Sequence, residues 1–262
     1  MTDNIYLQLT EAFNRGRTRA IVSSGQAVVL HRLAIMSKDG DWIVRENPED
    51  LAFIRDELGR RGATYRFGAP LDERWLAGGW SSHFEFAANG MRVRCDFFSR
   101  PPRLSANELG QLWEREGRKP LPYLDVESLV RVKQTQREKD YAVIGELARK
   151  LPPERQLLCS RSARDLIELA SRDPDMVSTL ISERPLLGHA VRGDREALEE
   201  SLDRERRSLM RADEERLDAY AVAAAPWRAA WPGLQSSLGG VPLGKAHAGI
   251  LQAAEGVLPF NP

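Results

Sequence analysis

The sequence is poor in cysteine and has no excess of charge of either sign. Cys95 and Cys159 are the only cysteines in 262 residues, and they lie far apart, outside any CxxC motif or Cys/His cluster. This spacing argues against a disulfide framework and a structural zinc site, and it suits a reducing compartment. Lysine plus arginine number 38, as do aspartate plus glutamate. A balanced chain has no general attraction for polyanions, so no extended nucleic-acid surface is expected.

Long apolar runs are also missing. No stretch reaches the roughly 18 residues that a helix needs to cross a bilayer, so we expect no membrane contact and a cytoplasmic protein. Hydrophobic residues nevertheless make up 42% of the chain and charged residues 29%. That composition is typical of a globular protein with a packed core.

Helix and strand signals alternate in the first part of the chain. Residues 5–13 carry apolar side chains on one helical face, 19–23 are typical of a short buried strand, and 26–33 of a second helix. Two strand-like segments flank Asn89-Gly90, a pair that favours a two-residue hairpin turn.

Strand signals become rare after residue 103, and Pro152-Pro153 marks a boundary beyond which the chain is typical of helices. The predicted fold class is therefore α+β: a small mixed β-sheet with flanking helices, followed by an all-helical C-terminal region. The predicted domains are residues 1–150 and residues 151–262.

The segment IMSKDGDWIVR at positions 35–45 has two interpretations. Asp-Gly is a preferred hairpin turn, so Ile35 and Met36 could pair back on residues 42–44. Alternatively, Asp39 and Asp41 stand two apart at the entry to one strand, where both carboxylates would leave the same face and hold a cation. Taken alone, these eleven residues favour the hairpin turn over the cation site.

Other parts of the chain favour the cation site. Asp96 lies on the polar face of a strand, and Ser24-Gly25 separates a strand from a helix. Such a turn exposes backbone N–H groups that favour a phosphate. Three carboxylates beside an anion-binding turn are the parts of a two-metal phosphoryl-transfer site, and their oxygen ligands suit Mg²⁺ or Mn²⁺.

The order and spacing of Ser24-Gly25, Asp39-Gly40-Asp41 and Asp96 resemble the nucleotidyltransferase fold shared with polymerase β, in its minimal bacterial form. Residues 26–31 and Ser37 are similar to the toxin–antitoxin and abortive-infection group of that superfamily. Residues 129–140 are similar to the group's helical segment with a lysine, an arginine and a Lys-Asp pair. The resemblance spans about residues 1 to 150.

The resemblance implies an enzyme that moves a nucleoside monophosphate from a nucleoside triphosphate to an acceptor hydroxyl, on a protein, a small molecule or an RNA end. Asp39 and Asp41 would bind both metal ions, and Asp96 would bind one and help to deprotonate the acceptor. The implied triphosphate-binding residues are Ser24, Gly25, Lys133 and Arg137, although Arg137 equally suits the polar face of a helix.

Three positions depart from the family pattern. Ser24 stands where a first glycine is usual, Arg32 where the group often has glycine, and Gly40 where an apolar residue is usual. These departures favour an alternative function, since folds often keep the shape of a site after losing its chemistry. The alternative is an inactive nucleotidyltransferase-like module that binds nucleotide or a partner protein, for example within a toxin–antitoxin pair.

Overall fold

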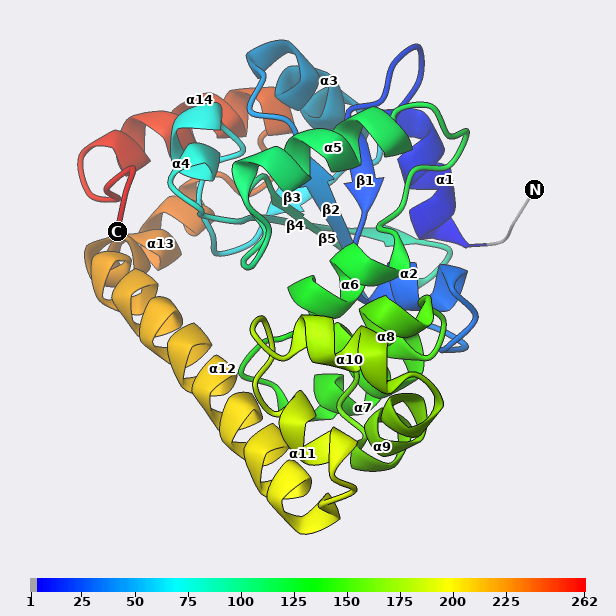
Figure 1. Cartoon of the computed structure of the whole chain (residues 1–262). Helices are drawn as coiled ribbons and strands as arrows, with labels where there is room; N and C mark the ends of the chain where they lie inside the picture. Colours follow the sequence, from blue (N-terminus) through cyan, green and yellow to red (C-terminus); the bar gives the residue numbers. More distant parts are fainter. Residues whose placement is uncertain (1–3) are drawn as a thin grey trace. The chain divides into compact units, whose positions relative to one another are not determined.

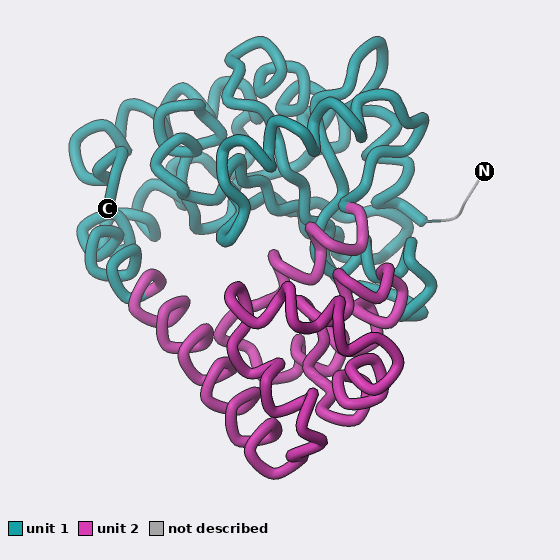
Figure 2. The backbone as a smooth tube through the Cα atoms, in the orientation of Figure 1, with its two compact units in different colours: residues 1–124, 218–262 teal, residues 125–217 magenta. Residues whose placement is uncertain are grey.

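The computed structural model describes residues 4–262, and the chain divides into two compact units (Figure 2). Residues 1–124 and 218–262 form the first, here called the sheet unit. Residues 125–217 form the second, here called the helical unit. The predicted α+β class, with a small mixed sheet, flanking helices and a helical C-terminal region, is confirmed.

The elements of the sheet unit, labelled in Figure 1, are α1 (Ile5–Phe13), β1 (Ala20–Val22), α2 (Ser24–Leu30), β2 (Gly40–Val44), α3 (Pro48–Gly59), β3 (Thr64–Tyr65), α4 (Glu73–Ala77), β4 (Ser82–Ala88), β5 (Met91–Phe98), α5 (Ala106–Glu116), α13 (Ala225–Ser237) and α14 (Leu243–Glu255). Those of the helical unit are α6 (Val126–Val132), α7 (Glu138–Ala148), α8 (Pro153–Cys159), α9 (Ala163–Arg172), α10 (Pro174–Leu180) and α11 (Leu187–Val191). Helix α12 (Arg195–Ala223) leads from the helical unit back into the sheet unit.

The strands form one sheet in the order β1-β2-β5-β4-β3. Strands β2 and β5 are parallel, and the other neighbouring pairs are antiparallel. Strand β5 is longer than β2, so β2 pairs only with residues 95–98 of β5. The first residues of β5 therefore pair with β4 on one side only.

One face of the sheet is aromatic and lies under α1. Phe13 of α1 contacts Trp42 and Phe97 edge-on, with ring centroids 5.3 and 5.7 Å apart, and the Trp42 and Phe97 rings stack. The Trp42 indole N–H donates to the Thr10 hydroxyl at 2.9 Å. Burial of these large rings accounts for much of the core, and it leaves the opposite face of β5 and β4 free for polar residues.

Local signals in the sequence correspond to the observed turns and caps. Asn89 and Gly90 join β4 to β5, both with positive φ (51° and 74°), as a type I′ turn requires. Asn47 caps α3 by accepting from the Asp50 N–H, and Pro48 occupies the first turn. The hairpin predicted around Asn89-Gly90 is therefore confirmed.

Residues 218–262 contact the rest of the sheet unit through hydrogen bonds between residues that are far apart in the sequence. The Trp75 indole donates to the Leu258 carbonyl (3.1 Å), the Trp80 indole to the Pro259 carbonyl (3.0 Å), and the Tyr220 hydroxyl to the Gly78 carbonyl (2.7 Å). Along the chain, the boundaries between the compact units therefore lie at 124/125 and 217/218, whereas the boundary predicted from the sequence lies at 150/151. The division into domains of residues 1–150 and 151–262 stays a prediction.

The helical unit has its own apolar core. It includes buried leucines from α8, α9, α11 and α12, among them Leu157, Leu166, Leu187 and Leu198. Cys159 and, in the sheet unit, Cys95 are buried free thiols. Within residues 4–262 no helix is both long enough and apolar enough to cross a bilayer.

Candidate active site

A row of polar side chains crosses the sheet on the face opposite the aromatic core. Asp41 of β2 and Asp96 of β5 are direct register partners on parallel strands. Asp96 is in turn opposite His83 of β4. Ser23 follows β1 and Arg66 follows β3, and their backbone N–H groups donate to the Asp41 and His83 carbonyls at 2.8 and 2.9 Å. We call these five residues the polar row; register partners point to the same side of a sheet.

Asp96 is the best-supported carboxylate of the polar row. Its Oδ1 accepts from the His83 ring at Nδ1 (2.7 Å) and lies 3.4 Å from an Arg66 guanidinium nitrogen. The Asp96 side chain is 22% exposed, so a ligand can still reach it. These two cationic or donating neighbours fix the orientation of the Asp96 carboxyl beside Asp41.

Asp39 lies just before β2 and differs from the other two carboxylates in its surroundings. Its Oδ1 is buried and has no hydrogen-bond partner among the described residues, while the Arg94 guanidinium lies 3.7 Å away. Burial, together with the nearby Cys95 and Asp39, raises the pKa of the Tyr6 hydroxyl to about 12. The Asp39 carboxylate is therefore near enough to Tyr6 to affect its ionisation, and it lies 3.7 Å from the Arg94 guanidinium.

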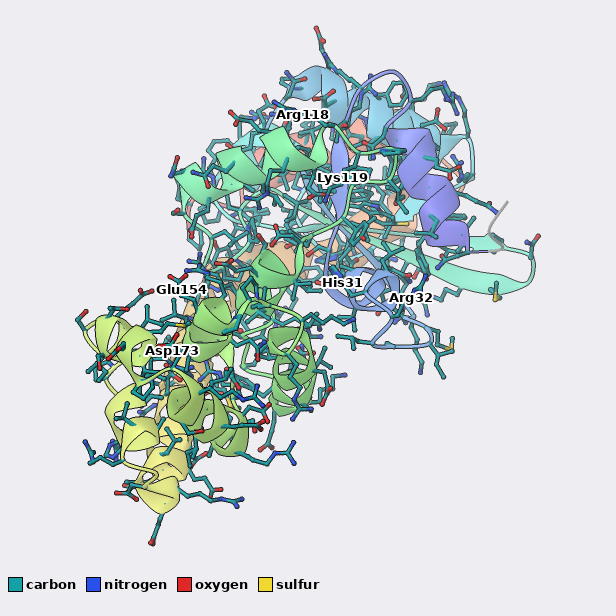
Figure 3. All side chains as sticks on the ribbon, turned by 45° about the vertical axis from the view of Figure 1, so that its right-hand side comes forward. His31, Arg32, Arg118, Lys119, Glu154 and Asp173 are labelled. Carbon is teal, nitrogen blue, oxygen red and sulfur yellow. The ribbon has the colours of Figure 1, made fainter. Side chains whose placement is uncertain are left out.

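The backbone is strained at Ser24, the first residue of α2. Ser24 has φ +47°, in the left-handed region that residues other than glycine avoid. Arg32, labelled with His31 in Figure 3, follows α2 with φ +61°. Both positions at which the family usually has glycine thus keep the conformation that glycine would favour.

Gly25 allows the segment ahead of β2 to approach α2. A Cβ atom at Gly25 would lie 2.2 Å from the Ser37 hydroxyl oxygen. The Gln26 side-chain amide reinforces this approach by donating to the Ser37 carbonyl (3.1 Å) and the Asp39 carbonyl (3.4 Å). The turn at Ser24-Gly25 and the segment that carries Asp39 are therefore packed against each other.

The pairing of β2 overturns the hairpin interpretation of residues 35–45. Strand β2 pairs with β1 and β5, and Ile35 and Met36 lie outside any strand. Gly40 is the first residue of β2, and a Cβ there would lie 2.3 Å from the Trp42 ring and 2.5 Å from the Tyr6 ring. The Trp42 and Tyr6 rings therefore leave no room for a side chain at this position.

Lys133 and Arg137 belong to the helical unit. The Lys133 ammonium is buried and donates to Asp140 Oδ1 at 3.1 Å. The more exposed Arg137 contacts the other Asp140 oxygen at 3.0 Å, and Thr135 also donates to that carboxylate. Asp140 therefore forms ion pairs with both cations that were predicted to bind the triphosphate.

The carboxylates fit a divalent metal in kind. Asp39, Asp41 and Asp96 offer the oxygen ligands that Mg²⁺ and Mn²⁺ prefer, and the Asp39 Oδ1 atom is a buried acceptor without a hydrogen bond. No three His, Cys, Asp or Glu side chains in the described part of the chain are gathered as a metal-binding group. Asp41 and Asp96 are neighbours, whereas Asp39 is turned toward Arg94.

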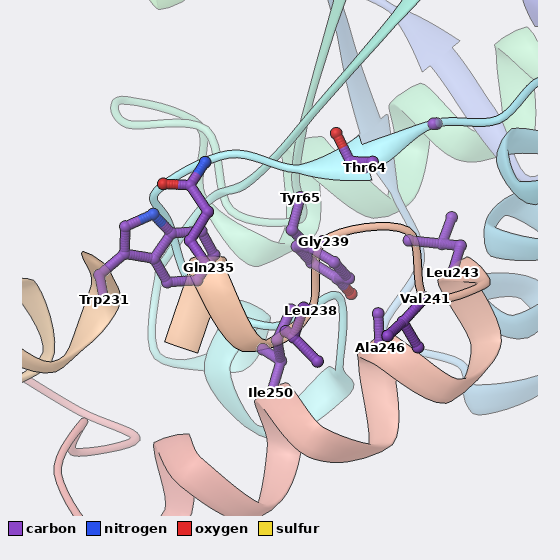
Figure 4. A pocket seen from close by; sticks show the side chains of 11 residues that line it. Thr64, Tyr65, Trp231, Gln235, Leu238, Gly239, Val241, Leu243, Ala246 and Ile250 are labelled. Carbon is purple, nitrogen blue, oxygen red and sulfur yellow. The ribbon is translucent and has the colours of Figure 1, made fainter. Parts of the chain in front are cut away.

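A separate apolar pocket of about 190 Å³ lies between β3, α13 and α14 (Figure 4). Its lining residues include Trp231, Leu238, Leu243 and Ile250, and none of the lining side chains is charged. Behind it, Tyr65 and Arg55 contact the two ring nitrogens of the buried His247 at 2.8 and 3.0 Å. Burial and the nearby Arg55 lower the pKa of His247 to about 4.

Sequence reasoning missed three members of the polar row, namely His83, Arg66 and Ser23. Strand β4 alternates buried Phe84 and Phe86 with His83 and Glu85, so its period-two pattern could have placed His83 on the polar face. Nothing in the sequence marks Ser23, whose buried hydroxyl has no hydrogen-bond partner within residues 4–262.

Two solved structures from Helicobacter pylori are similar to this chain. One is JHP933, with a TM-score of 0.39 and 14% identity over 81% of this chain and 94% of that chain. The other, a "putative nucleotidyltransferase", has a TM-score of 0.39 and 12% identity over 80% of this chain and 94% of its own. No family model and no curated protein matches the chain. At these TM-scores and identities, the two similarities carry no argument about the reaction.

Proposed function

We propose that the protein is a metal-dependent nucleotidyltransferase that moves a nucleoside monophosphate from a nucleoside triphosphate to an acceptor hydroxyl. The observation that carries the proposal is the register pairing of Asp41 with Asp96, next to the turn at Ser24-Gly25. Asp39, Asp41 and Asp96 would hold Mg²⁺ or Mn²⁺. The bound metal would stabilise the charge that develops on the phosphate oxygens during transfer.

The residues of the polar row would act on the acceptor. Asp96 takes the proton of the acceptor hydroxyl, whose oxygen then forms a bond to the α-phosphorus as the bond to the pyrophosphate leaving group breaks. His83 and Arg66 hold the Asp96 carboxyl in one orientation through their 2.7 and 3.4 Å contacts. Positioning of this kind contributes to rate by removing the cost of orienting the base at reaction.

The triphosphate would lie against the turn at Ser24 and Gly25. A triphosphate-binding role for Lys133 and Arg137, which belong to the helical unit, stays a prediction from the resemblance. For Lys133 this role requires that a phosphate oxygen replace Asp140 as the partner of its ammonium. Arg137 also contacts Asp140, but its guanidinium is more exposed and has further N–H groups to donate.

A second candidate is the inactive nucleotide- or protein-binding module. It is favoured by one observation, namely that Asp39 lies beside Arg94 while Asp96 is held by His83 and Arg66. Carboxylates committed to arginine and histidine have less capacity left for a metal ion.

Calorimetric titration with Mn²⁺ separates the two. The proposal expects the wild type to bind Mn²⁺ and Asp41→Asn to lose that binding while remaining folded. Asp56→Asn is the matched control, because Asp56 is an exposed aspartate on α3 of the same unit. Equal isotherms for Asp41→Asn and wild type would contradict the metal site.

A further inference from the structure

The start of β5 has an open backbone edge. Strand β2 pairs with β5 only from Cys95 onward, so in the described part of the chain residues 91–94 have β4 on one side and no strand on the other. The two-residue turn at Asn89-Gly90 makes Ala88 and Met91 a hydrogen-bonded pair, and hydrogen-bonded and non-hydrogen-bonded pairs then alternate along the hairpin. The N–H and C=O groups of Arg92 and Arg94 therefore point away from β4.

Arg94 confirms this direction, because its backbone N–H lies in hydrogen-bonding contact with the Tyr6 hydroxyl. The Tyr6 hydroxyl in turn donates to the Lys38 carbonyl at 2.5 Å. Arg92, two residues earlier, has the same orientation but no backbone partner within residues 4–262. One donor and one acceptor thus stand open at this edge.

Exposed apolar side chains border this edge. Ile35 is 98% exposed, Met36 73% and Met91 59%. They line a groove of about 550 Å³, which also includes residues 4–6 and 37–39 and residues 92–94 of β5. A volume of this size suits a short ligand segment. Met91 is also the exception among the inward residues of β5, since Val93, Cys95 and Phe97 are buried.

The groove leads to the proposed site. Asp39 and Arg94 line it, and each precedes a carboxylate of the polar row, Asp41 or Asp96, by two residues. Because side chains two apart on a strand share a face, a segment lying along β5 would end next to these carboxylates.

We propose that the groove binds an extended polypeptide segment, which adds a short strand beside Met91–Arg94. The open N–H and C=O of Arg92 would form hydrogen bonds with backbone groups of the segment. Ile35, Met36 and Met91 would pack against an apolar side chain of the segment. Lys38 is exposed and makes no ion pair among the described residues, so an acidic residue beside the apolar one complements it. This part of the proposal rests on the proposed function: a hydroxyl side chain of the bound segment is the acceptor of the nucleoside monophosphate. The substrate class is then a protein.

The test uses a phage-displayed library of random twelve-residue peptides, selected without nucleotide on full-length Asp41→Asn protein. Asp41 does not line the groove, so this variant lacks transfer under the proposed function but keeps the docking surface. Synthetic copies of enriched peptides are then measured by fluorescence anisotropy. We expect enriched sequences to contain an apolar residue with an acidic neighbour.

Two variants at one position isolate the backbone contribution. Arg92→Pro removes the open N–H while leaving pairing with β4 intact, and Arg92→Ala keeps the N–H but removes the charge. Affinity should fall at least about tenfold with Arg92→Pro and with Met36→Asp, but change less than about threefold with Arg92→Ala. Circular dichroism confirms that each variant is folded, and Met36→Asp serves alone if Arg92→Pro does not fold.

Failure to enrich any peptide would overturn the proposal, as would equal affinity of enriched peptides for wild type and Met36→Asp. Displacement of the peptides by a random-sequence RNA dodecamer that binds more tightly would also overturn it. Peptide binding without nucleotide transfer to a hydroxyl of the peptide would leave the docking surface standing but overturn the acceptor class. Failure of the proposed function shows separately, as absence of transfer to every acceptor by the wild type.

Discussion

Asp96 and Asp140 are both acidic residues beside cations, but they serve different ends in the structure. Asp96 is 22% exposed on a sheet face and contacts His83 and Arg66. Asp140 is buried between helices and holds the ammonium of Lys133 at 3.1 Å. An ion pair with one accessible oxygen can change partners when a ligand arrives, whereas a buried pair is costly to break. Burial therefore decides whether a charged motif is available for chemistry.

The largest expected effect is the loss of transfer on neutralising Asp96. Asp96→Asn keeps the size of the side chain and a hydrogen bond with His83, so folding and nucleotide affinity should change little. Because the amide cannot accept the acceptor's proton, kcat should fall by roughly 10² to 10³-fold. Single-turnover transfer and nucleotide titration measure the two quantities separately. A kcat of Asp96→Asn close to that of the wild type would mean that Asp96 serves only as an ion-pair partner of Arg66.

The next effect concerns stability in the helical unit. Lys133→Met leaves the buried Asp140 carboxylate with Arg137 and Thr135 only, and should lower the free energy of unfolding by about 3 kcal/mol. Arg137→Met is the control, since its more exposed side chain should contribute about 1 kcal/mol or less. Urea denaturation compares them. Similar losses for the two variants would remove the distinction between buried and exposed cations.

His247 supplies a pH-dependent stability term outside the proposed site. Its pKa is about 4 in the folded protein and about 6.5 when unfolded, so the unfolded chain binds more protons between these values. Stability is therefore complete above pH 6.5 and declines as the pH falls toward 4, by about 2 kcal/mol between pH 7 and 5. His247→Gln should flatten that decline in urea-denaturation series. Parallel pH curves for the variant and wild type would contradict the assignment.

The smallest effect is at Ser24, the first residue of α2. Glycine at position 24 relieves the strain of φ +47°, so Ser24→Gly should raise stability by about 0.5–1 kcal/mol despite the greater entropy of the unfolded chain. Ser178→Gly, in the exposed part of α10, should instead lower stability by up to about 1 kcal/mol. Thermal unfolding gives the two signs. A loss of stability in Ser24→Gly would mean that the serine side chain stabilises the turn.

Local signals predicted the elements near the site well. Asn89-Gly90 predicted the β4–β5 hairpin, and the alternation of β5 predicted that Asp96 would lie opposite buried Cys95 and Phe97. The expectation that Ser24 and Arg32 stand at glycine positions agrees with their positive φ values. Each of these features depends on a few consecutive residues.

Features that depend on distant segments were not predictable. The return of residues 218–262 to the sheet unit depends on indole–carbonyl hydrogen bonds such as Trp75 to Leu258, for which the sequence has no pattern. The neighbourhood of Ser23, Asp41, Asp96 and His83 depends on the strand order β1-β2-β5-β4, which short-range periodicity does not specify. The chain order of the carboxylates was readable, but their neighbours on the sheet were not.

The most direct test is transfer from α-labelled nucleoside triphosphates, each supplied with Mg²⁺ or Mn²⁺ and host lysate, by the wild type and by Asp41→Asn. The account predicts that the wild type moves label from at least one triphosphate to an acceptor, that a chelator abolishes this transfer, and that Asp41→Asn, matched for folding, loses it by at least about 10²-fold. Transfer by Asp41→Asn at the wild-type rate, or no transfer by the wild type with any triphosphate, would contradict it.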